Sequence, residues 1–422
     1  MRPFALLLAV CLILPGGVRA EVTHVPVKEG ALAQAIENAQ AGDILRLAKG
    51  THTGGLEIDK PLSLTCEEGA IINGPGKGSV LLVTAQNVEI SGCIITGSGN
   101  DHQEIDSGIR LLKSADGARV IGNRLIGNLY GVDIHGAKKT RVEGNVVDGR
   151  QDHRMNDRGN GVYVWNAPGS EVIGNDIRWG RDGIFVNTSH SNTFRNNRFR
   201  DLRFAVHYMY ANNSEVSGNL STGNHLGYAV MYSKRVKVLN NVSIDDDQHG
   251  VMLNYTNSSQ VSGNLVMNGR QKCLFVYNAH KNEISDNRFE RCGIGVHFTA
   301  GSERNAMSGN AFVGNRTQVK YVGSKWLDWS DGGRGNYWSD FAAYDLDGDG
   351  LADTTYRPND SMDHILWSQP SAKLLLGAPA VQLVRWAQSE FPALLPGGVV
   401  DTAPLMRPVT LTVPEWGPGY GG

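Results

Sequence analysis

The chain has 422 residues, with 40 lysines and arginines against 42 aspartates and glutamates, so its net charge is −2. This balance excludes the basic stripe of a nucleic-acid-binding protein and the polybasic arm of a lipid-binding protein. Past the N-terminus, no segment reaches the roughly 20 apolar residues that a membrane-spanning helix needs. We therefore expect no nucleic-acid partner and no direct membrane span.

The first 20 residues have the pattern of a secretory signal peptide. Arg2 is a short positive region, residues 4–14 are apolar, and the segment from Val18 to Ala20 offers a small-residue cleavage site. Cleavage near Ala20 predicts an exported protein, which in a bacterium resides in the periplasm. The alternative is an uncleaved N-terminal anchor, although the apolar stretch is shorter than a membrane span.

A short polar turn with an asparagine recurs at almost constant spacing, and the successive intervals are 22, 30, 22, 22, 22, 23, 23 and 23 residues. Each repeat also carries a glycine followed by alternating apolar residues, as in residues 183–187. Alternation predicts strands buried on one face, and glycine and asparagine suit corners with positive φ. Because so short a repeat buries its apolar face only by stacking, we predict an all-β, right-handed parallel β-helix. The recurring asparagines are Asn123, Asn145, Asn175, Asn197, Asn219, Asn241, Asn264, Asn287 and Asn310.

Both ends of such a coil need a lid, because an open end exposes the core and unpaired strand edges. Residues 31–41 form an amphipathic helix that suits the N-terminal lid, and an aromatic stretch suits a C-terminal plug. The predicted regions are 1–20 for the signal peptide, 21–42 for the first strand and capping helix, 43–322 for the β-helix, 323–370 for the plug with an aspartate-rich loop, and 371–422 for a helical and Pro/Gly-rich tail.

The tail begins with a second amphipathic helix, predicted over residues 371–391. Gly377 and Pro379 are expected to break or kink it. From Pro392 onward, the proline and glycine content predicts an extended or disordered segment.

Four cysteines follow the signal peptide: Cys66, Cys93, Cys273 and Cys292. An even number in an oxidising compartment permits disulfides, and Cys66 with Cys93 and Cys273 with Cys292 are each about one repeat apart. Buried free thiols fit the sequence equally well. A cysteine-based metal site is disfavoured because no C-x-x-C spacing occurs.

The outward positions of the glycine-led strands are aromatic and sulfur-rich, where an ordinary solvent-facing row carries Lys, Glu, Thr and Ser. The register places Met209 beside Met231 on adjacent coils, with His207 on the same face, and Met252 diagonal to Met231 across Ala229. Thioether and imidazole donors suit Cu(I), whereas Mg²⁺ and Ca²⁺ need oxygen. The alternative is an apolar face covered by another segment or a partner, with methionine as adaptable filler. The predicted copper ligands are His207, Met209, Met231 and Met252.

Two repeats are about eight residues too long, and the surplus falls at the same corner, over 97–107 and 149–160. Insertions at one corner of a solenoid often mark its binding side. This corner supplies a second choice of copper ligands, with solvated polar loops as the alternative. The second-choice residues are His102, His153, Met155, His225 and His249.

Alternating carboxylates in the predicted plug have the spacing of a calcium-binding loop. Gly350 supplies the sharp bend, and Asp353 closes the loop at its ninth position, earlier than the glutamate of an EF-hand. We predict a structural Ca²⁺ that pins the plug; a bare acidic turn is the alternative. The predicted calcium ligands are Asp345, Asp347, Asp349, the carbonyl of Leu351, and Asp353.

The sequence resembles the NosD family over nearly the whole mature chain. The resemblance rests on Leu32-x-x-Ala35-Ile36 with Ala41-Gly42-Asp43, on the Gly-Asn coils, and on the block Gly335–Asp340 followed by Asp345–Gly350. That last block is the specific part, since similar coils occur in many carbohydrate-binding and sugar-hydrolase solenoids. The resemblance identifies no copper ligands, so the residues named above rest on register alone.

Membership of that family implies a non-enzymatic periplasmic protein that assists maturation of the copper–sulfur centre of nitrous oxide reductase. It implies four partners: the membrane subunit and the ATPase of an ABC-type complex, a small copper chaperone, and the reductase. The helix over 371–391 and the tail would then be natural contacts for the membrane subunit.

The competing interpretation is a carbohydrate-active β-helix enzyme, either a polysaccharide lyase, a hydrolase or an epimerase. Such chemistry needs paired carboxylates at set distances, or a base with cations that hold uronates. The best candidates, Asp245, Asp246, Asp247 and His249, crowd one turn instead of spreading over stacked coils. We therefore favour a protein that is not an enzyme.

Overall fold

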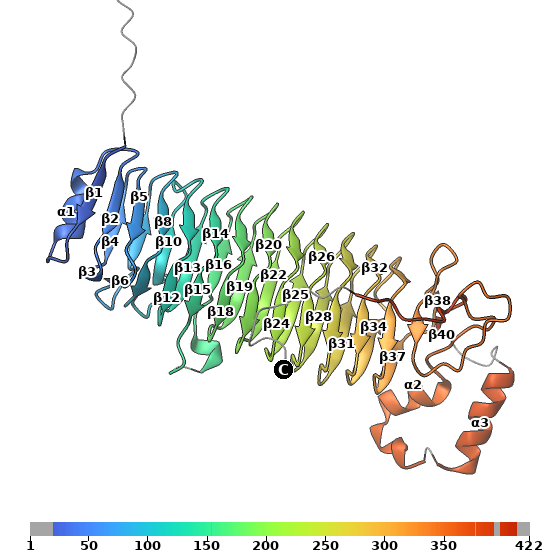
Figure 1. Ribbon diagram of the computed structural model, residues 1–422. Helices are drawn as coiled ribbons and strands as arrows, with labels where there is room; N and C mark the ends of the chain where they lie inside the picture. Colours follow the sequence, from blue (N-terminus) through green and yellow to red (C-terminus); the bar gives the residue numbers. More distant parts are fainter. Residues whose placement is uncertain (1–19, 153, 376, 392–396, 412–422) are drawn as a thin grey trace, which may run out of the picture.

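The computed structural model describes residues 20–152, 154–375, 377–391 and 397–411. The predicted signal peptide up to residue 19, His153 and the end of the predicted tail at 412–422 lie outside the described residues. The described chain winds into a long rod of stacked coils (Figure 1), and nearly every coil gives one strand to each of three parallel sheets. The predicted parallel β-helix is confirmed.

The three sheets run the length of the rod, and their strands follow in chain order. Sheet A contains β1 (Val22–Val25), β2 (Ile44–Leu47), β5 (Ser63–Cys66), β8 (Glu89–Ser91), β11 (Arg119–Ile121), β14 (Arg141–Glu143), β17 (Glu171–Ile173), β20 (Thr193–Arg195), β23 (Glu215–Ser217), β26 (Lys237–Leu239), β29 (Gln260–Ser262), β32 (Glu283–Ser285) and β35 (Ala306–Ser308). Sheet B contains β3 (Gly50–Thr53), β6 (Ala70–Asn73), β9 (Ile94–Thr96), β12 (Arg124–Ile126), β15 (Val146–Asp148), β18 (Asp176–Arg178), β21 (Arg198–Arg200), β24 (Leu220–Thr222), β27 (Val242–Ile244), β30 (Leu265–Met267), β33 (Arg288–Glu290), β36 (Ala311–Val313) and β39 (Tyr337–Trp338). Sheet C contains β4 (Leu56–Ile58), β7 (Leu81–Val83), β10 (Ser107–Leu111), β13 (Tyr130–His135), β16 (Val162–Trp165), β19 (Asp182–Asn187), β22 (Phe204–Met209), β25 (Leu226–Met231), β28 (His249–Asn254), β31 (Lys272–Tyr277), β34 (Ile294–Thr299) and β37 (Thr317–Val322).

The recurring asparagines form a ladder inside the rod. The backbone N–H and the side-chain amide of Asn197 both donate to Oδ1 of Asn219, at 2.9 and 3.0 Å, and the same pattern repeats from Asn123 to Asn336. These asparagines are buried. The positive φ belongs instead to the residue before each of the nine recurring asparagines from Asn123 to Asn310, as at Gly218, with a φ of 61°. The ladder holds the coils in register because a slip would leave buried amides unpaired.

The N-terminal lid is the helix α1 (Ala31–Asn38), which ends three residues before the predicted boundary. Leu32 and Ile36, one helical turn apart, are its buried side chains. At the other end, Trp338 stacks on Phe312 of the last coil with 4.4 Å between ring centroids. Trp329 is also buried there, so aromatic residues close the C-terminal end.

The predicted tail differs from the structure. Its strand β40 (Gly398–Val400) pairs with β38 (Trp326–Asp328) in the plug. The following Asp401 is completely buried and accepts hydrogen bonds from Trp338 Nε1 and from the backbone N–H of Asn336, both at 2.7 Å. Residues 397–411 therefore belong to the plug, although their composition predicts an extended or disordered segment.

The helix predicted over 371–391 is two elements, the 3₁₀ helix η2 (Pro370–Leu375) and the helix α3 (Pro379–Glu390). Pro379 occupies the first turn of α3, where its missing N–H does no harm. A further helix, α2 (Ser361–Ser368), was not predicted from the sequence; it begins with a reciprocal capping box between Asp360 and Asp363.

Both cysteine pairs are disulfides, which decides between the two alternatives that the sequence left open. Cys66 is bonded to Cys93, and Cys273 is bonded to Cys292. Each bridge links neighbouring coils, because the two cysteines are separated by 27 and by 19 residues respectively.

Candidate functional site

The candidate copper ligands lie on the outward face of sheet C, on β22, β25 and β28. The register pairs Met209 with Met231 and His207 with Ala229. Ala229 in turn pairs with Met252 on the next strand. The backbone arrangement predicted from the repeat is therefore present.

Ala229 is the floor of this arrangement. It points outward with only a methyl group, yet it is 1% exposed, so neighbouring side chains cover it. His207 and Met252 lie on the two flanking strands, and Met231 lies two residues along the same strand. Adjacent strands are about 4.8 Å apart, so long side chains on both sides of an alanine can converge above it. We use the name copper face for the predicted copper ligands His207, Met209, Met231 and Met252 together with Ala229 between them.

His207 is held by a buried ion pair. Its Nδ1 lies 3.1 Å from Oδ2 of Asp182, and Arg203 donates to both oxygens of that carboxylate, at 2.8 and 2.7 Å. Burial of Asp182 by itself raises the pKa of this carboxyl, but the hydrogen bonds from His207 and Arg203 outweigh it and place the pKa below its ordinary value. Asp182 is therefore ionised and fixes the proton of His207 on Nδ1.

The other ring nitrogen of His207, Nε2, is buried and has no hydrogen-bond partner among the described residues. The imidazole is 8% exposed and is packed between the rings of Phe185 and Phe204, each with its centroid 4.8 Å away. An imidazole with one nitrogen tied to a carboxylate and the other free of hydrogen bonds is the usual arrangement of a metal-binding histidine.

The second-choice residues do not form one site. His102 is engaged at both nitrogens, with Nδ1 3.1 Å from the hydroxyl of Tyr130 and Nε2 3.0 Å from the carbonyl of Asp157. It thus ties the first insertion to the second, which contains the short helix η1 (Met155–Asp157). Met155 is 37% exposed at that tip, and Tyr130 begins β13, three strands before β22 in sheet C.

The two later histidines lie closer to the copper face. His225 Nδ1 is 3.6 Å from Asp247 Oδ2 in an exposed turn. His249 begins β28, the strand that carries Met252, and its Nδ1 is buried without a hydrogen-bond partner. Burial first, and Lys272 second, lower the pKa of His249 to about 4.

A row of exposed tyrosines escaped the sequence analysis. Tyr210, Tyr232 and Tyr255 follow the outward positions on three successive coils, with 5.3 and 5.1 Å between ring centroids. All three have a positive φ, between 49 and 52°, which is strained for an aromatic residue. Their common place one residue after the outward pair was the signal that could have revealed them.

The aspartate-rich loop brings three of its predicted calcium ligands together. Oxygen atoms of Asp345, Asp347 and Asp349 all lie within 4.8 Å of one another. Backbone N–H groups of Gly348 and Gly350 donate to the two oxygens of Asp345, at 2.7 and 2.9 Å. Asp353 accepts from the backbone N–H of Leu346 at 2.8 Å, so its carboxylate closes the loop.

The carboxylates that were candidate catalytic groups for a carbohydrate-active enzyme do not lie together in one groove. Asp246 is buried inside the coil and accepts hydrogen bonds from the hydroxyls of Ser221 and Ser243, at 2.7 and 2.6 Å. Asp247 points to the exposed turn, where Arg270 Nε lies 2.8 Å from its Oδ1. The two side chains therefore act in different environments.

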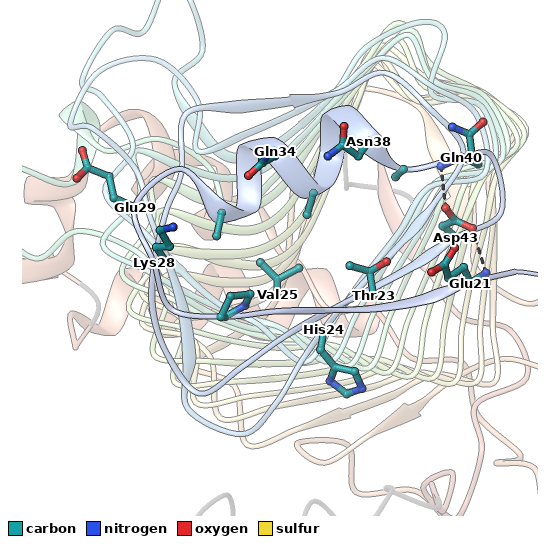
Figure 2. Close-up of a pocket in the computed structure, with 14 residues that line it drawn as sticks. Glu21, Thr23, His24, Val25, Lys28, Glu29, Gln34, Asn38, Gln40 and Asp43 are labelled. Atoms are coloured by element: carbon teal, nitrogen blue, oxygen red, sulfur yellow. Dashed lines mark hydrogen bonds between the residues drawn. The ribbon is translucent and has the colours of Figure 1, made fainter.

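A pocket of about 530 Å³ lies at the N-terminal lid, far along the chain from these residues. Figure 2 shows it between α1 and β1, where the backbone N–H groups of Glu21 and Gln40 both donate to Asp43. Its lining includes His24 but no methionine or cysteine. It is a feature of the lid and separate from the copper face.

Comparison with known proteins decides the family. Residues 143–343 match the family model described as periplasmic copper-binding protein (NosD), and this range contains the copper face. The chain is 40% identical over 376 residues to a protein of Stutzerimonas stutzeri named probable ABC transporter binding protein NosD, with 86% of each chain covered. The chain belongs to the NosD family.

A second NosD, from Pseudomonas aeruginosa, is 41% identical over 374 residues, covering 86% of this chain and 87% of its own. The names of these NosD relatives describe binding proteins and no enzyme. No helix in the described part of the chain is long and apolar enough to cross a membrane.

Solved structures of similar shape include an exopolygalacturonase from Thermotoga maritima, with a TM-score of 0.53, 10% identity, and coverage of 69% of this NosD-family chain and 87% of that one. A DFA-IIIase from Arthrobacter chlorophenolicus A6 has a TM-score of 0.53 and 15% identity, with 71% and 94% covered. At these identities the likeness shows the β-helix fold alone.

Proposed function

We propose that this NosD-family protein is a periplasmic accessory protein that holds Cu(I) on its copper face and delivers it during maturation of the copper centre of nitrous oxide reductase. The observation that carries the proposal is the buried, unpartnered Nε2 of His207 on the same outward face as Met209, Met231 and Met252. Neutral imidazole and thioether donors fit a soft monovalent cation, and they release it more readily than thiolates would.

The chemistry of the face suits a carrier. His207 supplies the strongest donor, and Asp182 keeps its proton on the far nitrogen. Met209 and Met231 are adjacent in register, and Met252 lies across Ala229. Copper here is the cargo, received from a small copper chaperone and passed on to the reductase.

Competition for Cu(I) with a chromogenic chelator under anaerobic, reducing conditions tests this function. We expect the mature protein to withdraw Cu(I), and the variant His207→Ala/Met209→Leu/Met231→Leu to bind it at least tenfold more weakly. Met267→Leu is the matched control, because Met267 lies on β30 of sheet B. Unchanged affinity in the triple variant would refute the copper face and shift attention to His249, His225, His102 and Met155.

The helical segment at the C-terminal end is proposed to dock on the membrane subunit of the ABC-type complex that carries the ATPase. Figure 1 shows α2 and α3 projecting from the rod beside the plug. Large apolar side chains are exposed there, among them Leu374 at 91%, Leu383 at 63% and Trp386 at 59%. Exposed apolar surface of this kind marks a protein contact.

Co-purification with the detergent-solubilised membrane subunit and ATPase tests the docking. Leu383→Asp/Trp386→Asp is expected to abolish co-purification and to leave Cu(I) affinity unchanged. Val27→Asp is the control, since Val27 is an exposed apolar residue near the opposite end. Full retention of the complex by the double variant would contradict this surface.

We also propose that the aspartate-rich loop binds a structural Ca²⁺. Three carboxylates within 4.8 Å repel one another, and a bound divalent cation would relieve this repulsion. Calorimetry of chelator-stripped protein is expected to show Ca²⁺ uptake that Asp347→Ala and Asp349→Ala remove. Absence of uptake by the stripped wild type would leave the loop as a bare acidic turn.

A further inference from the structure

Four basic side chains lie on the outward face of sheet C, directly beyond the copper face. The register pairs His249 with Lys272. It also pairs His297 with Phe275 on one side and with Lys320 on the other. We term His249, Lys272, His297 and Lys320 the basic cluster.

Phe275 forms the floor of the basic cluster. Its ring centroid lies 5.3 Å from that of His249 and 4.9 Å from that of His297. The ammonium of Lys272 lies 4.1 Å from the same centroid. Three basic groups from three successive strands therefore converge around one aromatic ring. Met252, the last thioether of the copper face, is the register neighbour of this phenylalanine.

In the described part of the chain, each imidazole of the basic cluster has one ring nitrogen that is not hydrogen-bonded. Nδ1 of His249 and Nδ1 of His297 are both buried and have no hydrogen-bond partner among the described residues. His249 is only 7% exposed. Burial first, and Lys272 second, lower the pKa of each ring to about 4, so both rings are neutral at neutral pH. A backbone hydrogen bond to Gln248 already engages His249, whereas the neutral ring of His297 carries one N–H that can donate to a ligand.

The charged groups of the basic cluster, Lys272 and Lys320, are both positive. Burial first, and then Lys272 and Lys320, lower the pKa of His297, and burial first, and then Lys320, lowers the pKa of Lys272. Between described residues, neither lysine forms an ion pair with a carboxylate. The acid that precedes His249, Asp247, is engaged by Arg270 at 2.8 Å and by His225 at 3.6 Å.

Partly buried positive charge without a counter-charge is unfavourable, and an anion would relieve it. A second metal cation would be repelled by both ammonium groups. We propose that the basic cluster binds a small inorganic anion, held by the ammonium groups of Lys272 and Lys320 and by the imidazole N–H of His297, beside Phe275. Soft-cation and anion sites then lie side by side on one face of the rod. The anion site stands without the copper proposal, because its charge comes from Lys272 and Lys320, and neither lysine is a candidate copper ligand.

Bromide and sulfate are the probes, each titrated into the full mature chain at constant ionic strength and followed by calorimetry. Saturable binding is expected, and Lys272→Gln and Lys320→Gln are each expected to weaken it at least tenfold. Lys237→Gln on β26 of sheet A is the matched control, since it removes the same charge from another face. Circular dichroism and thermal melting establish that each variant is folded.

Crystals soaked in bromide give an independent readout, because anomalous scattering locates the ion. We expect a peak among His249, Lys272 and His297 in the wild type and none there in Lys272→Gln. Two results would overturn the proposal: no saturable binding of either anion by the wild type, or equal weakening by Lys237→Gln and Lys272→Gln. Binding of bromide without sulfate would define a spherical, halide-sized site, and the reverse an oxyanion site; both support it.

Discussion

Asn224 and Asp246 occupy consecutive steps of a second ladder inside the β-helix, and the backbone N–H of Asn224 donates to Asp246 Oδ1 at 2.8 Å. One coil earlier, the backbone N–H of Leu202 donates to Asn224 Oδ1 at 2.9 Å. Asp246 thus stands where the ladder otherwise has an amide. Burial raises the pKa of Asp246 to about 7, although hydrogen bonds from Ser243 and Ser221 act against this rise.

This pKa makes the stability of the rod depend on pH. In the unfolded chain an aspartate ionises near pH 4, so between about pH 4 and 7 only the folded state retains the proton of Asp246. Its favourable contribution is complete below about pH 4, declines as the pH rises, and is lost above about pH 7. Asp246→Asn is therefore expected to gain stability relative to the wild type as the pH rises, by an amount on the order of 4 kcal/mol at most.

Thermal melting of both proteins between pH 4.5 and 8 measures this effect. The difference in Tm is expected to grow by several degrees over that range and to level off above pH 7. Asp245→Asn is the matched control, because Asp245 is exposed in the same turn. A pH-independent difference in Tm would show that Asp246 is ionised throughout.

A second prediction concerns the carboxylate behind His207. Asp182→Asn removes the charge that holds the proton on Nδ1, and we expect Cu(I) to bind about 10–100-fold more weakly. The variant also leaves Arg203 without its counter-charge, so it should be less stable. Asp148→Asn separates these effects, since Asp148 pairs with Arg178 and Arg124 on sheet B. This control should lose stability and keep its Cu(I) affinity; an Asp182→Asn variant with wild-type affinity would contradict the proposed role.

A third prediction uses the small residue at the centre of the copper face. Ala229→Leu fills the space above the floor and should weaken Cu(I) binding at least tenfold, because the donors can no longer converge. Because neighbouring side chains cover Ala229, the larger side chain should also lower the free energy of unfolding, by about 1–3 kcal/mol. Thr299→Leu on β34 is the control for an outward leucine. Chelator competition and denaturant unfolding measure both quantities.

The repeat made the fold and the backbone register predictable from the sequence. Met209 and Met231 pair as expected because a constant spacing in a solenoid forces equivalent positions onto adjacent strands. The asparagine ladder was predicted only as turns, since burial of an amide is invisible until the coil closes around it. The same constraint hid the role of Asp246, which reads as one of three acids in a surface turn.

Other parts of the site could not be predicted, because they depend on contacts between coils. Asp182 begins its strand 25 residues before His207, and nothing local indicates that the two side chains meet. The basic cluster was hidden for the same reason, because Lys272 and His297 belong to different repeats. The plug strand β40 escaped prediction because the residues around it in the sequence are rich in proline and glycine. The strand is held in place by the hydrogen bonds that the following residue, Asp401, accepts from the plug.

The last prediction therefore concerns Asp401. Its Oδ2 accepts from Trp338 Nε1 and from the backbone N–H of Asn336, and its Oδ1 accepts from the backbone N–H of Ala403 at 3.2 Å. An asparagine has one oxygen in place of two, so its NH2 group would face a donor on one of these two sides. A buried donor left unpaired costs about 1–3 kcal/mol, so Asp401→Asn should lower the free energy of unfolding by that amount. Urea unfolding followed by tryptophan fluorescence measures it, because Trp338 and Trp329 report on the plug. Asp328→Asn is the control, since Asp328 is an exposed acid that accepts from Ser330 and Thr402. If both variants unfold like the wild type, the strand after residue 397 does not hold the plug in solution, and the lid depends on its aromatic stacking alone.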